Sequence, residues 1–178
     1  MKKDINVYEY MNEVVSGVKE GSLVTVKNGE KVNCMTISWG QIGIEWHKLI
    51  FTVFIRNDRF THEMLENASE FTINMSLTAN QDPIQQKILE LCGTESGRDI
   101  DKVKELDLSL VEGTNIETPG IKEFPLTLEC KIIYRQLQEK ELMVDTIKDR
   151  FYPKHKSEEY KKYHTMFYGE VVGAFIIE

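Results

Sequence analysis

The alternation of apolar and polar residues predicts a protein built mostly of strands. In the clearest segment, residues 71–77, apolar side chains at every second position alternate with Thr72, Asn74 and Ser76. This period of two is typical of a strand with one face in the core and a polar opposite face. The same alternation predicts a strand over residues 125–135. Strands are therefore expected to form the core.

Other strands are indicated by turn residues and by β-branched runs. Asn28-Gly29 separates residues 23–27 from residues 32–39, and this dipeptide is a strong hairpin signal because both residues tolerate positive φ. The glycine-bracketed residues 40–43 are then expected to form a loop where backbone can approach a ligand. Further strands are predicted over residues 49–55, 142–147 and 167–177.

Helices are expected between the strands. Helical spacing predicts an amphipathic helix over residues 7–18, capped by Asp4 and followed by Gly21. Shorter helices are predicted over residues 60–68, 82–93 and 101–106, and a solvated, highly charged one over residues 154–162. Strands at short intervals with irregularly inserted helices favour a mainly β fold, a closed or nearly closed antiparallel barrel with peripheral helices.

Length and charge restrict the class of protein. The chain has 178 residues, 41% of them hydrophobic, and we expect one domain over residues 1–178, with residues 1–21 packed on the barrel. Its 22 basic and 29 acidic residues give a net charge of −7, which disfavours nucleic acid as a partner. No apolar run is long enough for a signal peptide or a membrane span, so we expect a cytoplasmic protein with no membrane partner.

The familiar metal and nucleotide motifs are missing. The three cysteines, Cys34, Cys92 and Cys130, form no CxxC motif, which argues against a disulfide framework and a zinc site. We expect all three to be reduced and packed. The histidines at positions 47, 62 and 155 show no ligand spacing either, so no metal is expected. Neither GxGxxG nor GxxxxGK[ST] occurs, so any nucleotide must be held in another way.

Several short motifs follow one another in a specific order. They are residues 33–43 (NCMTISWGQIG), residues 56–61 (RNDRFT), Cys92-Gly93 with residues 96–99 (SGRD) and Asp101-Lys102, residues 126–130 (LTLEC), and His164 ahead of residues 168–173 (YGEVVG). In this order the chain resembles the flavin reductase-like family, close to its flavoredoxin branch, over about residues 20–178. One departure lies at residues 46–49 (WHKL), where the family often has a proline.

The resemblance implies a fold, a cofactor and an activity. The fold is an FMN-binding split β-barrel with Greek-key antiparallel strands, and the assembly is a homodimer with the flavin site near the subunit interface. The implied activity is that of an NAD(P)H-dependent flavin oxidoreductase. It transfers hydride from NADH or NADPH to FMN and passes electrons to a small-molecule or protein acceptor. The alternatives are a non-enzymatic FMN-binding electron-transfer protein reduced by a partner and, with less support, a pyridoxamine-phosphate oxidase-like enzyme.

The first candidate site segment is the end of the strand before Gly40. In the family, this strand end and its loop give backbone N–H groups to the pyrimidine edge of the flavin, where negative charge develops on reduction. The residues concerned are Met35, Thr36, Ile37, Ser38 and Trp39. From the residues alone, an ordinary strand that leads into a glycine loop is the simpler interpretation.

The second candidate group is a phosphate anchor. Arg56, Arg59 and Thr61 precede a short predicted helix, so two guanidinium groups, a hydroxyl and helix N–H groups could converge on the FMN phosphate. Two solvated arginines beside a capped helix are an equally good interpretation. Asn74 and Ser76 could meet the ribityl hydroxyls or the ring edge, or could belong to a solvent-facing strand surface.

Two further side chains complete the prediction. The resemblance places Lys102 near the flavin, either of its own subunit or across a dimer interface, whereas a solvated charge cluster with Asp99 and Asp101 is the alternative. His164 is predicted to lie at the exposed flavin face as a hydrogen-bond donor that positions substrate. A structural histidine is the alternative for that position.

Overall fold

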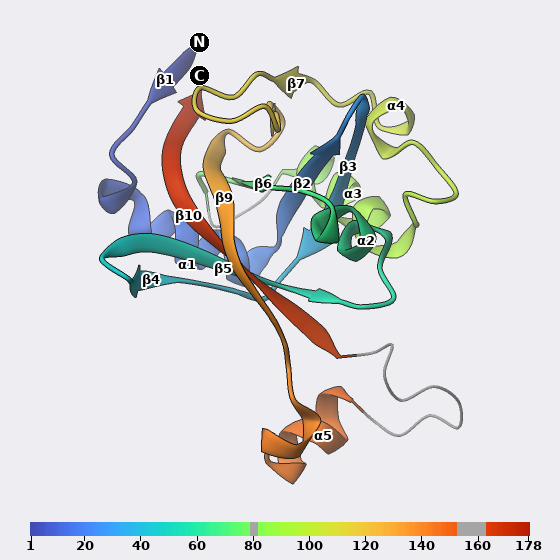
Figure 1. The fold of residues 1–178 in the computed structure, drawn as a ribbon. Coiled ribbons are helices and arrows are strands. Elements are labelled where there is room, and N and C mark those ends of the chain that lie inside the picture. The colour runs from blue at the N-terminus through green and yellow to red at the C-terminus, as the bar shows by residue number, and fades with distance from the viewer. Residues whose placement is uncertain (79–81, 153–162) are drawn as a thin grey trace.

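One antiparallel sheet forms most of the molecule and curves round into a barrel (Figure 1). The structure is a computed structural model that describes residues 1–78, 82–152 and 163–178. Within these ranges the sheet has eight strands, seven of them in the order β3-β2-β6-β9-β10-β5-β4. They are β1 (Lys2–Asp4), β2 (Ser22–Asn28), β3 (Lys31–Ile37), β4 (Gly40–Glu45), β5 (Lys48–Arg56), β6 (Glu70–Met75), β9 (Leu126–Leu137) and β10 (His164–Ile177).

The barrel is split between its two end strands. β3 and β4 lie at opposite ends of the strand order and do not pair, although only Ser38 and Trp39 separate them in the chain. β1 pairs with the end of β10, beyond the part of β10 that pairs with β5. The main strand predictions and the split antiparallel barrel with peripheral helices are therefore confirmed.

The prediction of a loop over residues 40–43 is wrong. These residues begin β4, which forms a hairpin with β5 through Trp46 and His47, both at positive φ (51° and 59°). Positive φ at both central residues is the geometry of a tight type I′ turn. Gly40 is needed for packing, because a Cβ there would lie 2.7 Å from the Phe51 ring. Glycine here marks close contact between strands rather than a loop.

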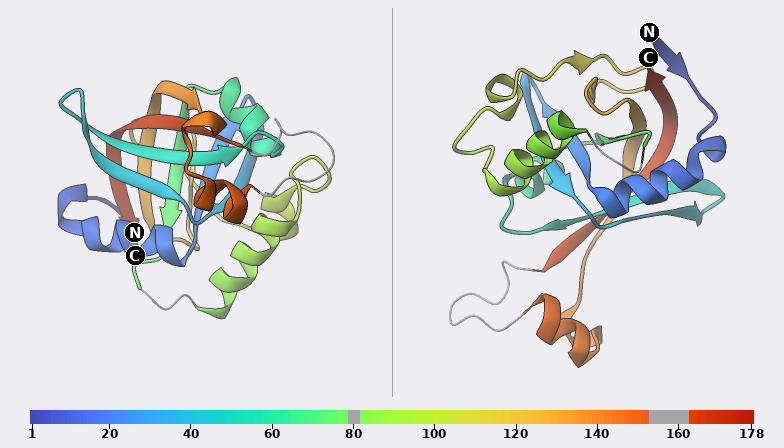
Figure 2. Two further views of the ribbon diagram at one scale, coloured as in Figure 1. Left: turned by 90° about the horizontal axis from the view of Figure 1, so that it is seen from below. Right: turned by 180° about the vertical axis from the view of Figure 1, so that it is seen from behind.

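The helices surround the barrel (Figure 2). They are α1 (Met11–Glu20), preceded by the short helix η1 (Val7–Tyr10), then α2 (Phe60–Glu66), α3 (Pro83–Thr94), α4 (Lys102–Glu105), η2 (Lys140–Leu142) and α5 (Asp145–Phe151). Asn6, not Asp4, caps the first helical segment: its side chain accepts from the backbone N–H of Tyr8, while Asp4 pairs in β1. Among the described residues, no helix is long and apolar enough to cross a membrane.

The segment between β9 and β10 begins with two short helices, η2 and α5. The strand predicted over residues 142–147 is wrong, because this stretch contains the end of η2 and the beginning of α5. Its apolar side chains Leu142, Val144 and Ile147 are exposed. An apolar run alone does not distinguish a strand from a helix with exposed apolar residues. The helix predicted over residues 154–162 lies outside the described residues.

Two apolar clusters hold the fold together. The larger fills the barrel interior and includes Phe51, Phe71 and Phe167, all fully buried. The smaller packs the outer faces of β2 and β3 against α3, through residues such as Leu23, Cys34 and Cys92. β2 and β3 are therefore buried on both faces over much of their length, and α3 fixes the position of β3 beside the split.

Candidate functional site

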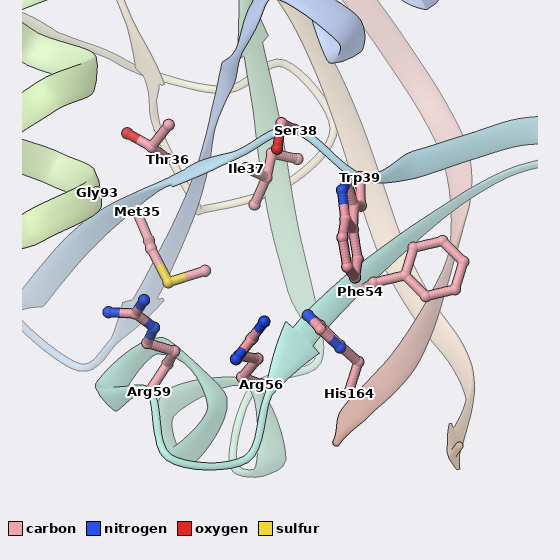
Figure 3. Close-up of a pocket in the computed structure, with 10 residues that line it drawn as sticks. All are labelled: Met35, Thr36, Ile37, Ser38, Trp39, Phe54, Arg56, Arg59, Gly93 and His164. Carbon is pink, nitrogen blue, oxygen red and sulfur yellow. The ribbon is translucent and has the colours of Figure 1, made fainter. Parts of the chain in front are cut away.

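A cavity of about 230 Å³ lies where β3 and β4 separate (Figure 3). Its wall combines the end of β3, the ends of β5 and β10, and the last part of α3. It is lined by Met35, Thr36, Ile37, Ser38, Trp39, Phe54, Arg56, Arg59, Gly93 and His164. Arg56, Arg59 and His164 reach up toward Met35 and Trp39 on the opposite side. We call this the first cavity.

Strand register brings Arg56 and His164 together. The two residues are Cα partners in the antiparallel pair of β5 and β10, so their side chains project on the same face of the sheet. The ring of His164 lies 4.8 Å from the ring of Trp39, centroid to centroid. Residues that are more than a hundred positions apart in the chain thus meet through the sheet.

His164 is buried and neutral near pH 7. It is 6% exposed, and its pKa is lowered to about 4 by burial and then by the charges of Arg56 and Arg59. Its Nδ1 lies 2.7 Å from the Tyr152 hydroxyl, which donates to Gln138 Oε1 at 2.9 Å. Because Tyr152 has one proton, this arrangement favours a proton on Nδ1 and leaves Nε2 as an acceptor. It does not favour the donor role predicted for His164.

A second cavity of about 120 Å³ adjoins the first and shares Met35 and Arg59 with it. Its other lining residues are Asp58, Phe60, Thr61, Glu95, Ser96, Gly97, Arg98 and Lys102. Three cationic side chains therefore face a small space, although Arg98 pairs with Glu63. Thr61 Oγ1 accepts a 2.9 Å hydrogen bond from Asn33 Nδ2, which leaves the Thr61 proton free to be donated.

Lys102 is the most deeply placed of these cations. It is 4% exposed and donates to the backbone oxygens of Cys34 (3.1 Å) and Cys92 (2.9 Å), which uses two of its three N–H donors. Burial lowers the pKa of Lys102 first, and the positive charge of Arg59 acts in the same direction. Arg59 thus depresses the pKa of Lys102 in one cavity and that of His164 in the other, which indicates a positive potential between them.

The structure brings together most of the predicted site residues, but not Asn74 and Ser76. Asn74 is 0% exposed: its amide donates to Leu23 O and Thr25 Oγ1, and its Oδ1 accepts from Ile121 N at 2.9 Å. Ser76 is buried and bonds to Thr78. The polar face of β6 is therefore covered by the chain itself and faces neither solvent nor the cavities, so we do not retain either residue in the proposed site.

The comparison with protein families decides the relationship. A family model described as "Flavin reductase like domain" matches residues 15–178. The chain belongs to this family. This confirms the resemblance found in the motifs.

Relatives in the flavin reductase-like family are distant. An uncharacterized protein of Archaeoglobus fulgidus is 28% identical over 136 residues, which cover 72% of this chain and 66%, just under two thirds, of that protein. A solved FMN-binding domain of a flavin reductases-like enzyme from Shewanella baltica has a TM-score of 0.67 at 17% identity, over 99% of this chain and 77% of that one. The flavoredoxin of Desulfovibrio vulgaris (Miyazaki F) has a TM-score of 0.63 at 22% identity, over 89% and 69%. These structures share the fold.

Some cavity residues of this family member were not singled out from its sequence. Phe54 lies within a continuous apolar run and gave no signal, yet it is one of the few partly exposed positions of β5 and lines the first cavity. Gly93 and Arg98 belong to motifs that carried the resemblance, but no role was derived for them. The signal for these two was the motif order, not their chemistry.

A larger hollow of about 560 Å³ adjoins the second cavity and shares Gly97, Arg98 and Lys102 with it. In the described part of the chain no aromatic side chain lines it, and its charged residues are of both signs, with Asp99 and Asp101 beside the cations. It is therefore a poorer place for a flat ring than the first cavity, in spite of its size.

Proposed function

We propose that this chain binds FMN in the two connected cavities and works as an NAD(P)H-dependent flavin oxidoreductase. The observation that carries the proposal is the pair of residues, Met35 and Arg59, that line both cavities. They join a space with aromatic walls to a small space with cationic walls. This combination fits a flat ring joined by a short chain to a phosphate.

The first cavity fits the ring. Trp39, Phe54 and His164 provide flat or apolar surface in its wall. In the sheet order β3 pairs only with β2, so the opposite edge of β3 keeps backbone groups outside the ladder at the cavity. Backbone donors of this kind can bond the polar edge of a ring, which supports the proposed role of residues 35–39.

The second cavity fits the phosphate. Arg59 and Lys102 supply positive charge, and Thr61 has a proton that its bond from Asn33 does not use. Asp58 and Glu95 in the same wall oppose this charge in part. Burial lowers the pKa of Lys102 and of His164, and the charge of Arg59 adds to both effects; a dianionic group would offset this charge. Arg56 lines only the first cavity, so we assign it to the ring side rather than to the phosphate.

In this proposal the protein's own residues hold FMN and orient the nicotinamide substrate. FMN, when bound, supplies the two-electron chemistry that side chains lack. Arg59, Lys102 and Thr61 would bind its charged end, and Trp39 would exclude water from one side. His164, neutral and fixed by Tyr152, would place an acceptor nitrogen beside a ligand donor such as a carboxamide. In this proposal the site selects and positions the nicotinamide substrate.

Anaerobic mixing with each nicotinamide nucleotide tests the activity. The FMN-loaded protein should lose its visible flavin absorbance within seconds to minutes of adding NADH or NADPH. The rival proposal, an electron-transfer protein reduced by a protein partner, expects no bleaching with either nucleotide but rapid bleaching with a chemical reductant. The colour after extensive dialysis shows whether FMN stays bound. A yellow protein would hold FMN as a prosthetic group, and a colourless protein that still reduces added FMN would use it as a released substrate.

We also propose that the active form is a homodimer, with an electron acceptor that approaches the shared cleft. The two connected cavities, about 230 and 120 Å³, together reach only the lower end of the roughly 300–1,000 Å³ of common ligand sites, so a partner surface would help to enclose a cofactor. Exposed apolar residues Leu142 and Ile147 lie on the same segment as Phe151, whose ring contacts Trp39. Sedimentation should give twice 20.7 kDa. A flavin-retaining monomer would contradict the shared site.

A further inference from the structure

Two cysteines that are far apart in the sequence lie in contact beside the first cavity. Cys34 is on β3, and Cys92 is near the end of α3. Their Sγ atoms are 3.4 Å apart, and the two residues are 0% and 1% exposed. A disulfide needs about 2.05 Å between the sulfurs, so closing the pair requires a movement of somewhat more than one ångström.

The backbones around the pair are held in place. Lys102 bonds the carbonyl oxygens of both Cys34 and Cys92. The Thr36 hydroxyl donates to Leu89 O at 2.6 Å, which ties β3 to α3 a second time. These bonds keep the two thiols facing each other, so their effective concentration is high.

The environment favours one thiolate in the pair. The hydrogen bond between the thiols lowers the pKa of Cys92, and the ammonium of Lys102 acts in the same direction against burial. The same thiol bond and burial raise the pKa of Cys34. A dithiol in which one member ionises more easily than the other is suited to react with peroxides and disulfides.

We propose that Cys34 and Cys92 form a reversible disulfide, with hydrogen peroxide as the oxidant. Cys92 sulfur attacks one peroxide oxygen: an S–O bond forms, the O–O bond breaks, and one water leaves after protonation. Cys34 sulfur then attacks Cys92 Sγ: the S–S bond forms, the S–O bond breaks, and a second water leaves with the thiol proton. Two thiols and one peroxide thus become one disulfide and two waters.

The location puts the thiol pair directly behind the wall of the first cavity, which gives the bond a consequence. Thr36, on the same face of β3 as Cys34, and Gly93, next to Cys92, both line the first cavity. A Cβ on Gly93 would already lie 3.4 Å from Thr36 Cβ, so β3 and α3 are in close contact there. Drawing the sulfurs together therefore changes the wall of the cavity. The disulfide itself does not depend on what the cavity binds.

Thiol counting tests the proposal. The native protein is treated with hydrogen peroxide, quenched in acid, denatured and alkylated with iodoacetamide, and its intact mass is measured. Untreated protein should carry three alkylated cysteines, and treated protein one. Peptide mapping should find residues 34 and 92 in one cross-linked species, and dithiothreitol should restore three. Cys130 is the internal control, because it packs in the larger apolar cluster, whereas Cys34 and Cys92 pack in the smaller one.

Matched variants complete the test. Cys130→Ala should fall from two alkylated cysteines to none, and Cys34→Ala should form no cross-link. Three alkylated cysteines after treatment, with methionine sulfoxide present to show that peroxide reached the protein, would overturn the proposal. So would sulfinic acid at Cys92 without a cross-link, or a cross-link that includes Cys130. If a variant does not fold, thiol counting and peptide mapping on the wild-type protein still decide whether the disulfide forms.

Discussion

Two groups of polar side chains lie beside the same sheet and differ in their partners. Among the described residues, Asn74 bonds to several other parts of the chain, including the backbone N–H of Ile121, which lies 47 residues further along. Around Arg59, Lys102 and His164, the side chains line cavities, and the cation Arg59 lies near both Lys102 and the neutral His164 ring. The first group is a structural network, and the second is suited to a ligand.

The difference shows that burial of polar residues alone does not identify a site. Asn74 and Lys102 are both almost completely buried, and both were candidates for flavin contacts. The two residues differ in the hydrogen-bonding groups that remain unused. The Asn74 amide is bonded to Thr25, Ile121 and their neighbours, whereas Lys102 keeps one N–H donor for a ligand. The predictions below test this distinction.

Asn74→Ala should have the largest effect, and on stability alone. The change leaves the N–H of Ile121 and the hydroxyl of Thr127 without their acceptor in a buried place, and should cost about 3–5 kcal/mol of unfolding free energy. Denaturant unfolding measures it. Asn67→Ala, at an exposed asparagine, is the matched control and should cost less than about 1 kcal/mol. FMN affinity of the folded variant should equal that of the parent; weakened binding would return Asn74 to the site.

The pH dependence of stability should report the burial of His164 beside the charges of Arg56 and Arg59 in the first cavity. Above pH 6.5, His164 is neutral in both states and contributes nothing. Below it, the unfolded chain takes up a proton that the folded chain refuses until about pH 4, so stability falls across this window by up to about 3 kcal/mol.

Comparison with a variant isolates this contribution. Parent protein and His164→Gln are unfolded at pH 7 and pH 4.5, and the parent should lose more stability between the two values. Carboxylates titrate in both proteins and cancel. Inorganic phosphate, by offsetting Arg56 and Arg59, should raise the pKa of His164 and reduce the loss. Equal losses in parent and variant would show that His164 is not shielded from protonation.

The sequence predicted the barrel better than its edges. The alternation in β6 and β9 predicted both strands correctly, although burial does not alternate along either of them: Thr72 and Asn74 are as buried as their apolar neighbours. β4 was missed because Gly40 and Gly43 resemble loop residues, and the need for Gly40 comes from Phe51 on the next strand. The beginning of α5 was mistaken for a strand because Val144 and Ile147 are apolar yet exposed. These errors arise where neighbouring elements, rather than local pattern, decide the outcome.

The candidate site was predictable from motif order but not from spacing. Arg56 and Arg59 are close in sequence but differ in place. Arg59 lines both cavities, whereas Arg56 lines the first, because the β5–β10 register puts it beside His164. The cover over Asn74 and the contact between Cys34 and Cys92 both depend on long-range packing. No short-range pattern reports which polar residues will find internal partners.

Arg59→Ala should weaken FMN binding without the stability loss of Asn74→Ala. Losing one charge-assisted contact to phosphate should cost about 1.5–3 kcal/mol, or roughly ten- to hundredfold in Kd, measured by flavin fluorescence titration. Arg135→Ala, which removes an arginine from β9 outside the cavities, is the matched control and should leave Kd unchanged. If Arg59→Ala binds FMN with the same Kd as the parent, Arg59 does not hold the phosphate, and the assignment of the second cavity to the phosphate is wrong.

Substitution of Thr61 should have the smallest effect. It is also the most direct test of the comparison, because Thr61 contacts both the structural hydrogen-bond network and the second cavity. Its oxygen accepts from the buried Asn33 amide, while its proton is available to the second cavity. Thr61→Val removes both functions at nearly constant volume and should cost about 1 kcal/mol of stability and roughly threefold to tenfold in FMN affinity. Thr61→Ser keeps the hydroxyl and should retain most of both. If Val lowers the melting temperature but leaves Kd unchanged, Thr61 belongs only to the structural network. The phosphate would then be held by Arg59 and Lys102, whose charge does not depend on the Thr61 hydroxyl.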